Sequence, residues 1–280
     1  MSCATHNSSS SLVPGSEQSR PMRITVAPNG ARRQREHHPE LPVTLDEIVN
    51  CAERCYHAGA DEIHLHVRDE KGQHSLCPER YRRTIAAISD RVPAMDIQIT
   101  TEAAGLYSVE EQFALLRELR PGSASIAVRE TLRQPELVKP LYDFAAKAGI
   151  NVQHILYNPG DLEQLRLLIE REDIPGHMRD VLLVFGSYTP PVPAQAREVA
   201  PFVDALGGEF PNWTLCAFGQ NENAVAAEAI RLGGNIRIGF ENNIQSPDGS
   251  PAKDNAENIA LAVTTARKLA RPLLQEVHPS

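Results

Sequence analysis

Long apolar runs and clusters of basic residues are both missing from this chain of 280 residues. No stretch approaches the roughly 20 apolar residues that a membrane-spanning helix needs, so a membrane partner is not expected. The net charge is −8 and no lysine- or arginine-rich run occurs, which argues against nucleic acid as a partner. The balance of 41% hydrophobic and 23% charged residues is that of an ordinary globular protein.

Paired cysteine motifs and the serine motif of hydrolases are missing too. The five cysteines are odd in number and none belongs to a CxxC pair, which favours reduced thiols and a cytoplasmic location over a disulfide framework. No serine lies within a GxSxG motif. Cys216, the one cysteine near a predicted strand end, lies in mid-strand, so a cysteine nucleophile is poorly supported.

The first 21 residues have the composition of a leader or a tag. The stretch SSSSLVPGS resembles a protease-cleavable linker that lacks its expected arginine, and a natural serine-rich leader is the alternative. Neither contains the apolar core of a signal peptide. We expect residues 1–21 to be disordered and residues 22–280 to form a single domain.

Apolar, β-branched runs alternate with segments of helical periodicity through the rest of the chain. Eight strands, each followed by a helix, over about 250 residues predict an α/β fold of the (β/α)8 or TIM-barrel type. The predicted strands are 23–27, 62–67, 96–101, 123–128, 151–157, 180–187, 213–219 and 235–240. The predicted helices are 44–58, 78–90, 108–119, 134–148, 161–171, 194–206, 222–232 and 253–270.

The main alternative fold is a doubly wound open sheet, which requires a reversal of strand order that sequence does not reveal. No glycine-rich phosphate motif follows the first strand, because PNGARR has one glycine and does not match GxGxxG. No linker divides the chain. These points favour the barrel, whose chemistry lies at the C-terminal ends of its strands.

The segment EIHLHVRD (62–69) places His64, His66 and Arg68 at alternate positions of the second predicted strand. Alternate residues of a strand share a face. One histidine there can be a satisfied core residue, but two inward imidazoles must be hydrogen-bonded or bind something. A His-x-His pair offers two nitrogens to one metal ion and leaves room for a third ligand.

The third ligand is predicted at the end of the last strand, in GGNIRIGFENN (233–243). Arg237 and Glu241 share one face of this strand, so Glu241 stands at the rim and faces the barrel mouth. A carboxylate that merely caps the following turn is the alternative. Two histidines and one carboxylate with open positions form a catalytic site for zinc, and the same set suits ferrous iron in an oxygenase.

Other polar side chains gather at the predicted strand ends, among them the arginines Arg129 and Arg237. Guanidinium groups bind carboxylates in a bidentate geometry. The mouth therefore suits a small anionic substrate that bears a carboxylate. Further rim residues are Thr100, Thr101, Glu102, Ser125, Glu130, Gln153, His154, Tyr157, Asn158, Ser187, Tyr188, Gln220 and Asn221.

Six motifs occur in one order along the chain: TVAPNGAR, LPVTLDEI, HLHVRDEKG, IQITT, GGNIRIGFENNI and KDNAENIALA. In these motifs the chain resembles the beta-keto acid cleavage enzymes, from about Arg23 to Pro272. The resemblance implies a (β/α)8 barrel with zinc at its mouth, assembled as a homotetramer. It also implies a retro-Claisen exchange in which a beta-keto acid and acetyl-CoA give acetoacetate and a new acyl-CoA.

The resemblance assigns roles to individual positions, each of which carries the residue type that the family uses there. The matching positions are His64, His66 and Glu241 for the zinc ligands, Arg237 for the active-site arginine, Thr100 for the substrate-binding hydroxyl, and Ser125 for the hydroxyl on the fourth strand.

Several positions depart from the family pattern. The aspartate that follows the zinc-binding glutamate, implicated in proton abstraction, is Asn242 here, and an amide cannot act as that base. The substrate-binding glutamate of the first loop is Arg32, and the acidic pair on the fifth strand is Gln153 and Ile155. A substrate with an amine is therefore not expected, and a second negative charge, bound by Arg32 or Arg129, fits better.

The departures from the family pattern leave open which group is the base and whether the protein turns over a substrate. Glu102, Glu130 and a zinc-bound water are the candidates for the base. Asn242 can orient Glu241 through a hydrogen bond or contact a substrate carboxylate. We predict a metal-dependent acyltransferase that cleaves a carbon–carbon bond. The alternative is a metal-binding barrel that has lost turnover and binds a small molecule.

Overall fold

Eight parallel strands close into a barrel in the computed structural model, which describes residues 20–188 and 190–277. The order around the barrel is β1–β12–β11–β8–β7–β6–β5–β2, so the last strand pairs with the first. The predicted (β/α)8 fold is confirmed, and the open sheet was the wrong alternative. The strands are β1 (Ile24–Val26), β2 (Glu62–Leu65), β5 (Asp96–Thr100), β6 (Ser123–Ala127), β7 (Asn151–Leu156), β8 (Asp180–Phe185), β11 (Trp213–Ala217) and β12 (Asn235–Ile238).

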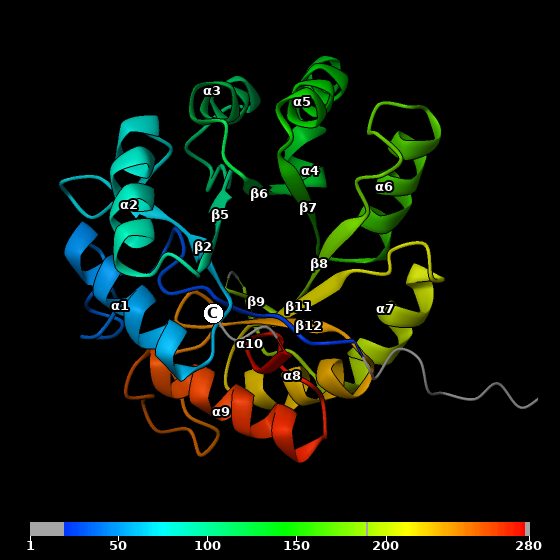
Figure 1. Cartoon of the computed structure of the whole chain (residues 1–280). Helices are drawn as coiled ribbons and strands as arrows, with labels where there is room; N and C mark the ends of the chain where they lie inside the picture. Colours follow the sequence, from blue (N-terminus) through cyan, green and yellow to red (C-terminus); the bar gives the residue numbers. More distant parts are fainter. Residues whose placement is uncertain (1–19, 189, 278–280) are drawn as a thin grey trace, which may run out of the picture.

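Helices surround the barrel and cover its outer face (Figure 1). Within residues 20–188 and 190–277, none of them is both long and apolar enough to cross a membrane. The main helices are α1 (Leu45–Ala58), α2 (Pro78–Arg91), α3 (Val109–Leu119), α5 (Pro135–Ala148), α6 (Pro159–Glu170), α7 (Val199–Leu206), α8 (Glu222–Arg231) and α9 (Asn255–Lys268). Short elements that were not predicted are α4 (Val128–Thr131), η1 (Ala196–Glu198), α10 (Leu274–Val277) and the strands β3 (Val67–Arg68), β4 (His74–Ser75), β9 (Ser187–Tyr188) and β10 (Pro191–Val192).

Local sequence fixes where several helices begin and end. Thr44 caps α1 and Ser108 caps α3, and each forms a capping box with the glutamate three residues later, Glu47 or Glu111. α5 ends at Gly149, whose φ of +70° is left-handed and suits glycine. These three helices accordingly begin and end within one residue of their predicted bounds.

The second barrel strand is shorter than predicted. β2 ends at Leu65, and β3 instead pairs antiparallel with β4 in a hairpin. Arg68 is buried there and donates to the backbone carbonyls of Asn29, Gly30 and Arg33 at 3.2, 2.5 and 3.0 Å. The expectation that Arg68 shares a face with the two histidines is therefore wrong, because the chain leaves the barrel before it and the arginine holds the loop after β1.

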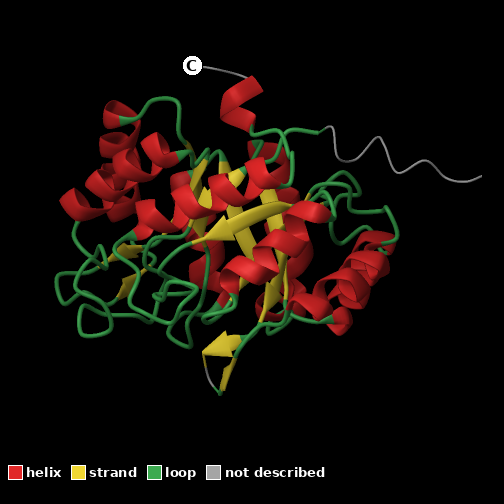
Figure 2. Ribbon diagram, turned by 90° about the horizontal axis from the view of Figure 1, so that it is seen from below, coloured by secondary structure: helices red, strands yellow, loops and turns green. Residues whose placement is uncertain are grey.

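A second hairpin, β9–β10, projects from one end of the barrel (Figure 2). It follows β8, and Ser187 and Tyr188 of β9 line a cavity at the C-terminal ends of the barrel strands. The ring of Tyr188 packs on Phe218 with 4.4 Å between centroids, and the guanidinium carbon of Arg33 lies 4.9 Å from the centre of the Tyr188 ring. The hairpin therefore forms part of the wall of the mouth.

The two ends of the described chain meet at the end of the barrel where β1 begins, opposite the mouth. Met22 is buried, its amide donates to the carbonyl of Pro272 at 2.8 Å, and its own carbonyl accepts from the amide of Leu274 at 3.0 Å. The predicted leader, residues 1–21, lies almost entirely outside the described residues.

Candidate metal centre and active site

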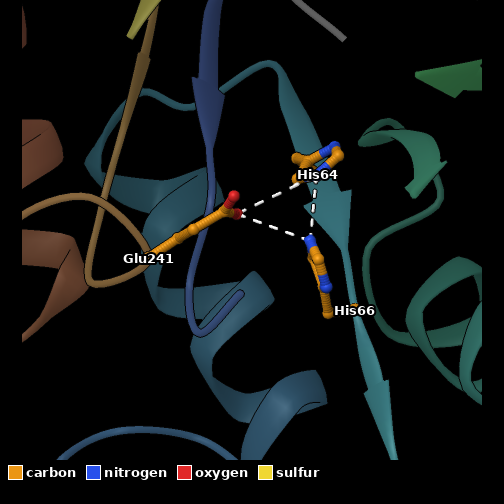
Figure 3. Close-up of side chains that lie close together, drawn as sticks. All are labelled: His64, His66 and Glu241. Atoms are coloured by element: carbon orange, nitrogen blue, oxygen red, sulfur yellow. Dashed lines mark hydrogen bonds and ion pairs between the residues drawn. The ribbon is translucent and has the colours of Figure 1, made fainter. Parts of the chain in front are cut away.

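Three potential metal ligands meet at the C-terminal ends of β2 and β12 (Figure 3). His64 is on β2, His66 follows that strand, and Glu241 lies just past β12. The Nε2 atoms of the histidines are 3.2 Å apart, and Oε2 of Glu241 lies 3.8 Å from Nε2 of His64 and 3.7 Å from Nε2 of His66. The described part of the chain holds no other such group of histidine, cysteine or acidic residues.

Burial sets the charge of these side chains. Desolvation lowers the pKa of both His64 and His66 well below the usual value, and the positive charge of Arg237 adds to the shift of His64. Desolvation raises the pKa of Glu241, while Arg237 and Arg68 oppose it. Oε2 of Glu241 has no hydrogen-bond partner among the described residues. Neutral imidazoles beside an unpaired carboxylate oxygen are the donor set that a divalent cation takes.

A chain of side chains inside the barrel fixes the orientation of His64. Its Nδ1 lies 2.8 Å from Oε1 of Gln98, so Nδ1 carries the proton and the lone pair of Nε2 faces Glu241. Gln98 in turn donates to Gln153 at 3.3 Å, and Gln153 donates to Thr214 at 3.1 Å. Gln153 thus lies below the centre and not at the rim, where it was predicted. Sequence analysis missed Gln98, although its alternation with Thr100 in IQITT indicates the same inward face.

Glu241 is held in place by tight backbone packing. Its amide donates to the carbonyl of Ala27 at 3.0 Å. Gly30 lies against the side chain, and a Cβ added to this glycine would lie 2.5 Å from Cγ of Glu241. Gly239 has a φ of +147°, and a Cβ added to it would lie 2.4 Å from the carbonyl oxygen of Ala27. The Glu241 side chain and its backbone therefore fit only because Gly30 and Gly239 lack side chains.

Arg237 is buried beside Glu241 and has N–H groups to spare. Its Nη2 donates to Oε1 of Glu241 at 3.2 Å and to Sγ of Cys216 at 3.6 Å. Burial is the largest influence on the pKa of Arg237 and acts to lower it, but Glu241, Cys216 and Tyr157 together raise the pKa above its usual value, so the guanidinium stays charged. Its Nε and Nη1 have no partner among the described residues. Two buried N–H groups of this charged side chain are therefore unpaired among the described residues.

A cavity of about 450 Å³ adjoins these groups at the barrel mouth, within the range of about 300–1,000 Å³ typical of small-molecule sites. Its two sides differ in chemistry. The polar side comes from β2, β5 and β12 and consists of His64, Thr100, Glu102, Arg237 and Glu241. The other side comes from β6, β7, β8 and the residues after them and after β11, and it carries the apolar side chains of Ala127, Ile155, Val184 and Phe218 as well as Arg129, Glu130 and Tyr157.

The two predicted hydroxyl residues occupy different places. Thr100 lines the cavity, and its Oγ1 accepts from the amide of Glu102 at 2.9 Å, which leaves its own proton free to donate. Ser125 is buried below the cavity lining, and its hydroxyl has no partner among the described residues. Thr100 can therefore reach a ligand in the cavity directly, whereas Ser125 does not line it.

Glu102 lines the cavity and is paired only loosely. Its Oε1 lies 3.6 Å from Nη2 of Arg32, and the side chain of Arg32 is 54% exposed. Burial, with repulsion from Glu241 and Glu130, raises the pKa of Glu102 to about 7. A carboxyl group with this pKa can exchange protons near neutral pH.

Glu130 and Arg129 also line the cavity, but structural contacts engage both. Oε2 of Glu130 accepts from the amide of Ala103 at 3.0 Å and from Nε2 of Gln112 at 2.7 Å. Arg129 forms a two-pronged ion pair with Asp161 at 3.2 and 2.6 Å. These contacts favour Glu102 over Glu130 as a mobile base and leave Arg129 little freedom to bind substrate.

Asn242 is fully buried and does not line the cavity. Its side-chain nitrogen and oxygen have no hydrogen-bond partner within the described residues, so the expected bond to Glu241 is not formed. Its backbone carbonyl accepts from Nη2 of Arg33 at 3.3 Å and from the amide of Gly219 at 3.2 Å. This position links loops around the mouth and does not reach a ligand in the cavity.

Comparison with known proteins identifies the family. A family model described as beta-keto acid cleavage enzyme matches residues 21–277. The chain belongs to the beta-keto acid cleavage enzyme family. The resemblance inferred from the six sequence motifs is thereby confirmed.

Relatives in the beta-keto acid cleavage enzyme family align over most of the chain. The 3-keto-5-aminohexanoate cleavage enzyme of Acetoanaerobium sticklandii is 30% identical over 259 residues, covering 89% of this chain and 93% of the relative. The enzyme of the same name from Fusobacterium nucleatum subsp. nucleatum is 31% identical over 262 residues, with the same coverage. The 3-oxoadipate:acetyl-CoA acetyltransferase of Cupriavidus necator is 24% identical over 265 residues, covering 90% of this chain and 91% of the relative.

Solved structures share the fold. The ternary complex of ObcA with a C4-CoA adduct and oxalate superposes with a TM-score of 0.70 at 17% identity, covering 85% of this chain. The binary complex of ObcA with oxaloacetate gives a TM-score of 0.67, also at 17% identity, covering 84% of this chain. This chain spans 66% and 65% of those longer chains.

Proposed function

We propose that this member of the family is a zinc-dependent acyltransferase. It would cleave a beta-keto acid with acetyl-CoA and release acetoacetate and a new acyl-CoA. The observation that carries the proposal is the group of three side chains that could hold a metal ion, beside an arginine that lines the same cavity. The names of the relatives support the reaction class, since one is a 3-oxoadipate:acetyl-CoA acetyltransferase. The substrate is anionic through its carboxylate, and we do not expect it to bear an amine.

His64, His66 and Glu241 would hold the zinc ion. Three protein ligands leave a coordination position open for substrate, as catalytic zinc sites require. A bound zinc ion supplies a Lewis acid that polarises the keto oxygen. Gln98 supports this assignment, because it orients His64 so that Nε2 is the available donor.

The protein side chains would bind the acid and move one proton. Arg237 donates to the substrate carboxylate through one of its unpaired N–H groups, on Nε or Nη1. The hydroxyl of Thr100 donates to the same ligand from β5. Glu102 takes a proton from the carbon between the carboxylate and the ketone, since it lines the cavity and its pKa is raised to about 7.

The exchange balances without an oxidant or a reductant. After Glu102 removes the proton, C2 of the keto acid bonds to the acetyl carbonyl carbon, and the CoA thiolate leaves. The thiolate then adds to the keto carbon, the bond from C2 to that carbon breaks, and C2 recovers a proton from Glu102. The products are acetoacetate and the acyl-CoA of the original substituent.

We also propose that the chain acts as a cytoplasmic homotetramer. The resemblance to the family supports the assembly, and light scattering coupled to gel filtration measures it directly. Free thiols at Cys51, Cys55, Cys77 and Cys216 suit a reducing compartment.

Two measurements test the proposed function. Metal analysis of protein purified without a histidine tag is expected to find one zinc per chain and none in His64→Ala. His154→Gln is the matched control, because His154 is a buried histidine outside the site that contacts Tyr142 and Met178. Incubation of a panel of beta-keto acids with acetyl-CoA is then expected to yield new acyl-CoA products. Stoichiometric iron would point to an oxygenase instead, and activity that survives His64→Ala would separate the metal from the chemistry.

A barrel that binds a metal and a small molecule without turnover is the second candidate. Asn242 favours it, because the amide stands where the family has an acidic residue implicated in proton abstraction and because it does not reach the cavity. Stoichiometric zinc together with saturable binding of keto acids, but no acyl-CoA product from any of them, would select this candidate.

A further inference from the structure

One stretch of the cavity wall is apolar, although Arg129, Glu130 and Tyr157, which follow β6 and β7, also line the cavity. Ala127, Ile155, Val184 and Phe218 come from neighbouring positions around the barrel and line the cavity together. They pack on Leu182 and Cys216 in one buried cluster inside the barrel. The metal ligands and Arg237 lie on the other half of the rim, so a keto acid whose carboxylate binds Arg237 has its substituent on the apolar side.

The charged groups around this wall have partners, Arg129 a tight one and Arg32 and Glu102 a looser one. Arg129 is bound to Asp161 through two contacts and lies over the ring of Tyr157 at 4.3 Å. Arg32 and Glu102 pair with each other at 3.6 Å. A second carboxylate or an amine on the substrate would have to compete with one of these pairs or lie unpaired against hydrocarbon, and both cost free energy.

We propose that the substrate is a beta-keto acid whose substituent beyond the ketone is uncharged and apolar. This inference rests on the proposed function and names its substrate class. It replaces the expectation, drawn from sequence, that Arg32 or Arg129 binds a second negative charge. The apolar wall favours binding because it buries the substituent away from water. It disfavours a charged substituent, because the charged residues around the wall are engaged with one another or with other residues.

A matched substrate series tests the proposal. Unbranched aliphatic 3-oxo acids are expected to show a kcat/KM that rises about fourfold per added methylene until the wall is covered. Analogues of equal length that end in a carboxylate or an ammonium group are expected to react at least about 100-fold more slowly. Preference for either charged analogue would overturn the inference.

Variants of the wall make the test specific. Ile155→Ala enlarges the apolar side and is expected to move the optimum to longer or branched substituents. Ala127→Leu fills the same space and is expected to move it to shorter ones. Ile126→Ala is the control for loss of a buried isoleucine, because Ile126 belongs to the outer core between strands and helices. An unchanged length profile in both wall variants would contradict the inference.

Binding measurements separate this inference from the proposed function. If no keto acid is cleaved by the holoenzyme, the proposed function fails, but calorimetry with unreactive carboxylates still probes the wall. Aliphatic monocarboxylates are then expected to bind more tightly than dicarboxylates of the same length, and Ile155→Ala to weaken the preference. The reverse order of affinities would overturn the inference by itself.

Discussion

Gln98 accepts a hydrogen bond from Nδ1 of His64 at 2.8 Å and so decides which nitrogen of that ring faces Glu241. Gln98→Leu removes the acceptor and lets the ring rotate or change tautomer. We expect metal affinity to fall by roughly 10–100-fold, as measured by competition with a chromogenic chelator. The fold should persist, because the substitution changes only the side chain and leaves the backbone pairing of β5 with β2 and β6 in place.

Two further variants control this result. Gln98→Glu keeps an oxygen acceptor at the same place and should retain most of the affinity. Gln112→Leu removes a different buried amide, which bonds Thr101 and Glu130, and should leave metal binding unchanged. Equal metal affinity in Gln98→Leu and the native protein would show that the contact does not orient the ligand.

The variant Gly30→Ala tests whether the position of the Glu241 carboxylate requires the space that glycine leaves beside it. In Gly30→Ala the new Cβ would lie 2.5 Å from Cγ of Glu241, which must move away. We expect a large loss of metal affinity. Gly105→Ala is the matched control, because Gly105 also has a positive φ, +78°, but has no atom within 4 Å of the added Cβ. Both variants should lose about 1 kcal/mol of stability or more through backbone strain, so only the difference in metal affinity reports on Glu241.

Glu102 is expected to govern the pH dependence of turnover. The base must be ionised, so kcat/KM should fall as the pH drops below about 7, the value to which burial and neighbouring carboxylates raise the pKa of Glu102. A divalent cation in the site opposes that shift and moves this limb to lower pH. Glu102→Gln should lower kcat by roughly 10²–10⁴-fold and abolish the limb, with a smaller effect on KM.

Two other variants identify the base by contrast. Glu130→Gln should lower activity less than Glu102→Gln, because Glu130 is tied to Ala103 and Gln112. Asn242→Asp should leave activity unchanged or reduce it, since it buries a second carboxylate next to Glu241. A sharp gain of activity in Asn242→Asp would mean that the asparagine disabled the base and that Glu102 does not replace it.

Arg129 is expected to matter for stability and little for substrate binding. Its guanidinium is bound to Asp161 through two contacts, of which the shorter is 2.6 Å. A double-mutant cycle of Arg129→Ala and Asp161→Asn should give a coupling of about 1 kcal/mol in denaturant unfolding, while KM for the keto acid changes little. A large rise of KM in Arg129→Ala, with stability unchanged, would restore the role predicted from sequence.

The barrel, and the approach of His64, His66 and Glu241 to one another, were predictable because both follow from local periodicity. Alternation of strand faces places His64 inward, and Glu241 follows the last strand at the same end. The roles of Arg129 and Arg68 were not predictable in this way. Arg129 meets Asp161, 32 residues away, only because the chain turns into α4. Arg68 left the shared face because β2 ends early and β3 begins a hairpin, a change of direction that the alternating pattern of EIHLHVRD does not reveal.

The separation of polar and apolar strands around the mouth has a consequence for engineering. The three candidate metal ligands lie on β2 or just after β2 and β12, whereas the apolar residues of the wall come from β6, β7 and β8. Libraries confined to Ala127, Ile155 and Val184 therefore leave the donor atoms of the centre untouched. Such libraries can change which substituent of the keto acid is accepted. Retention of bound metal would then identify the variants that keep the fold of the centre.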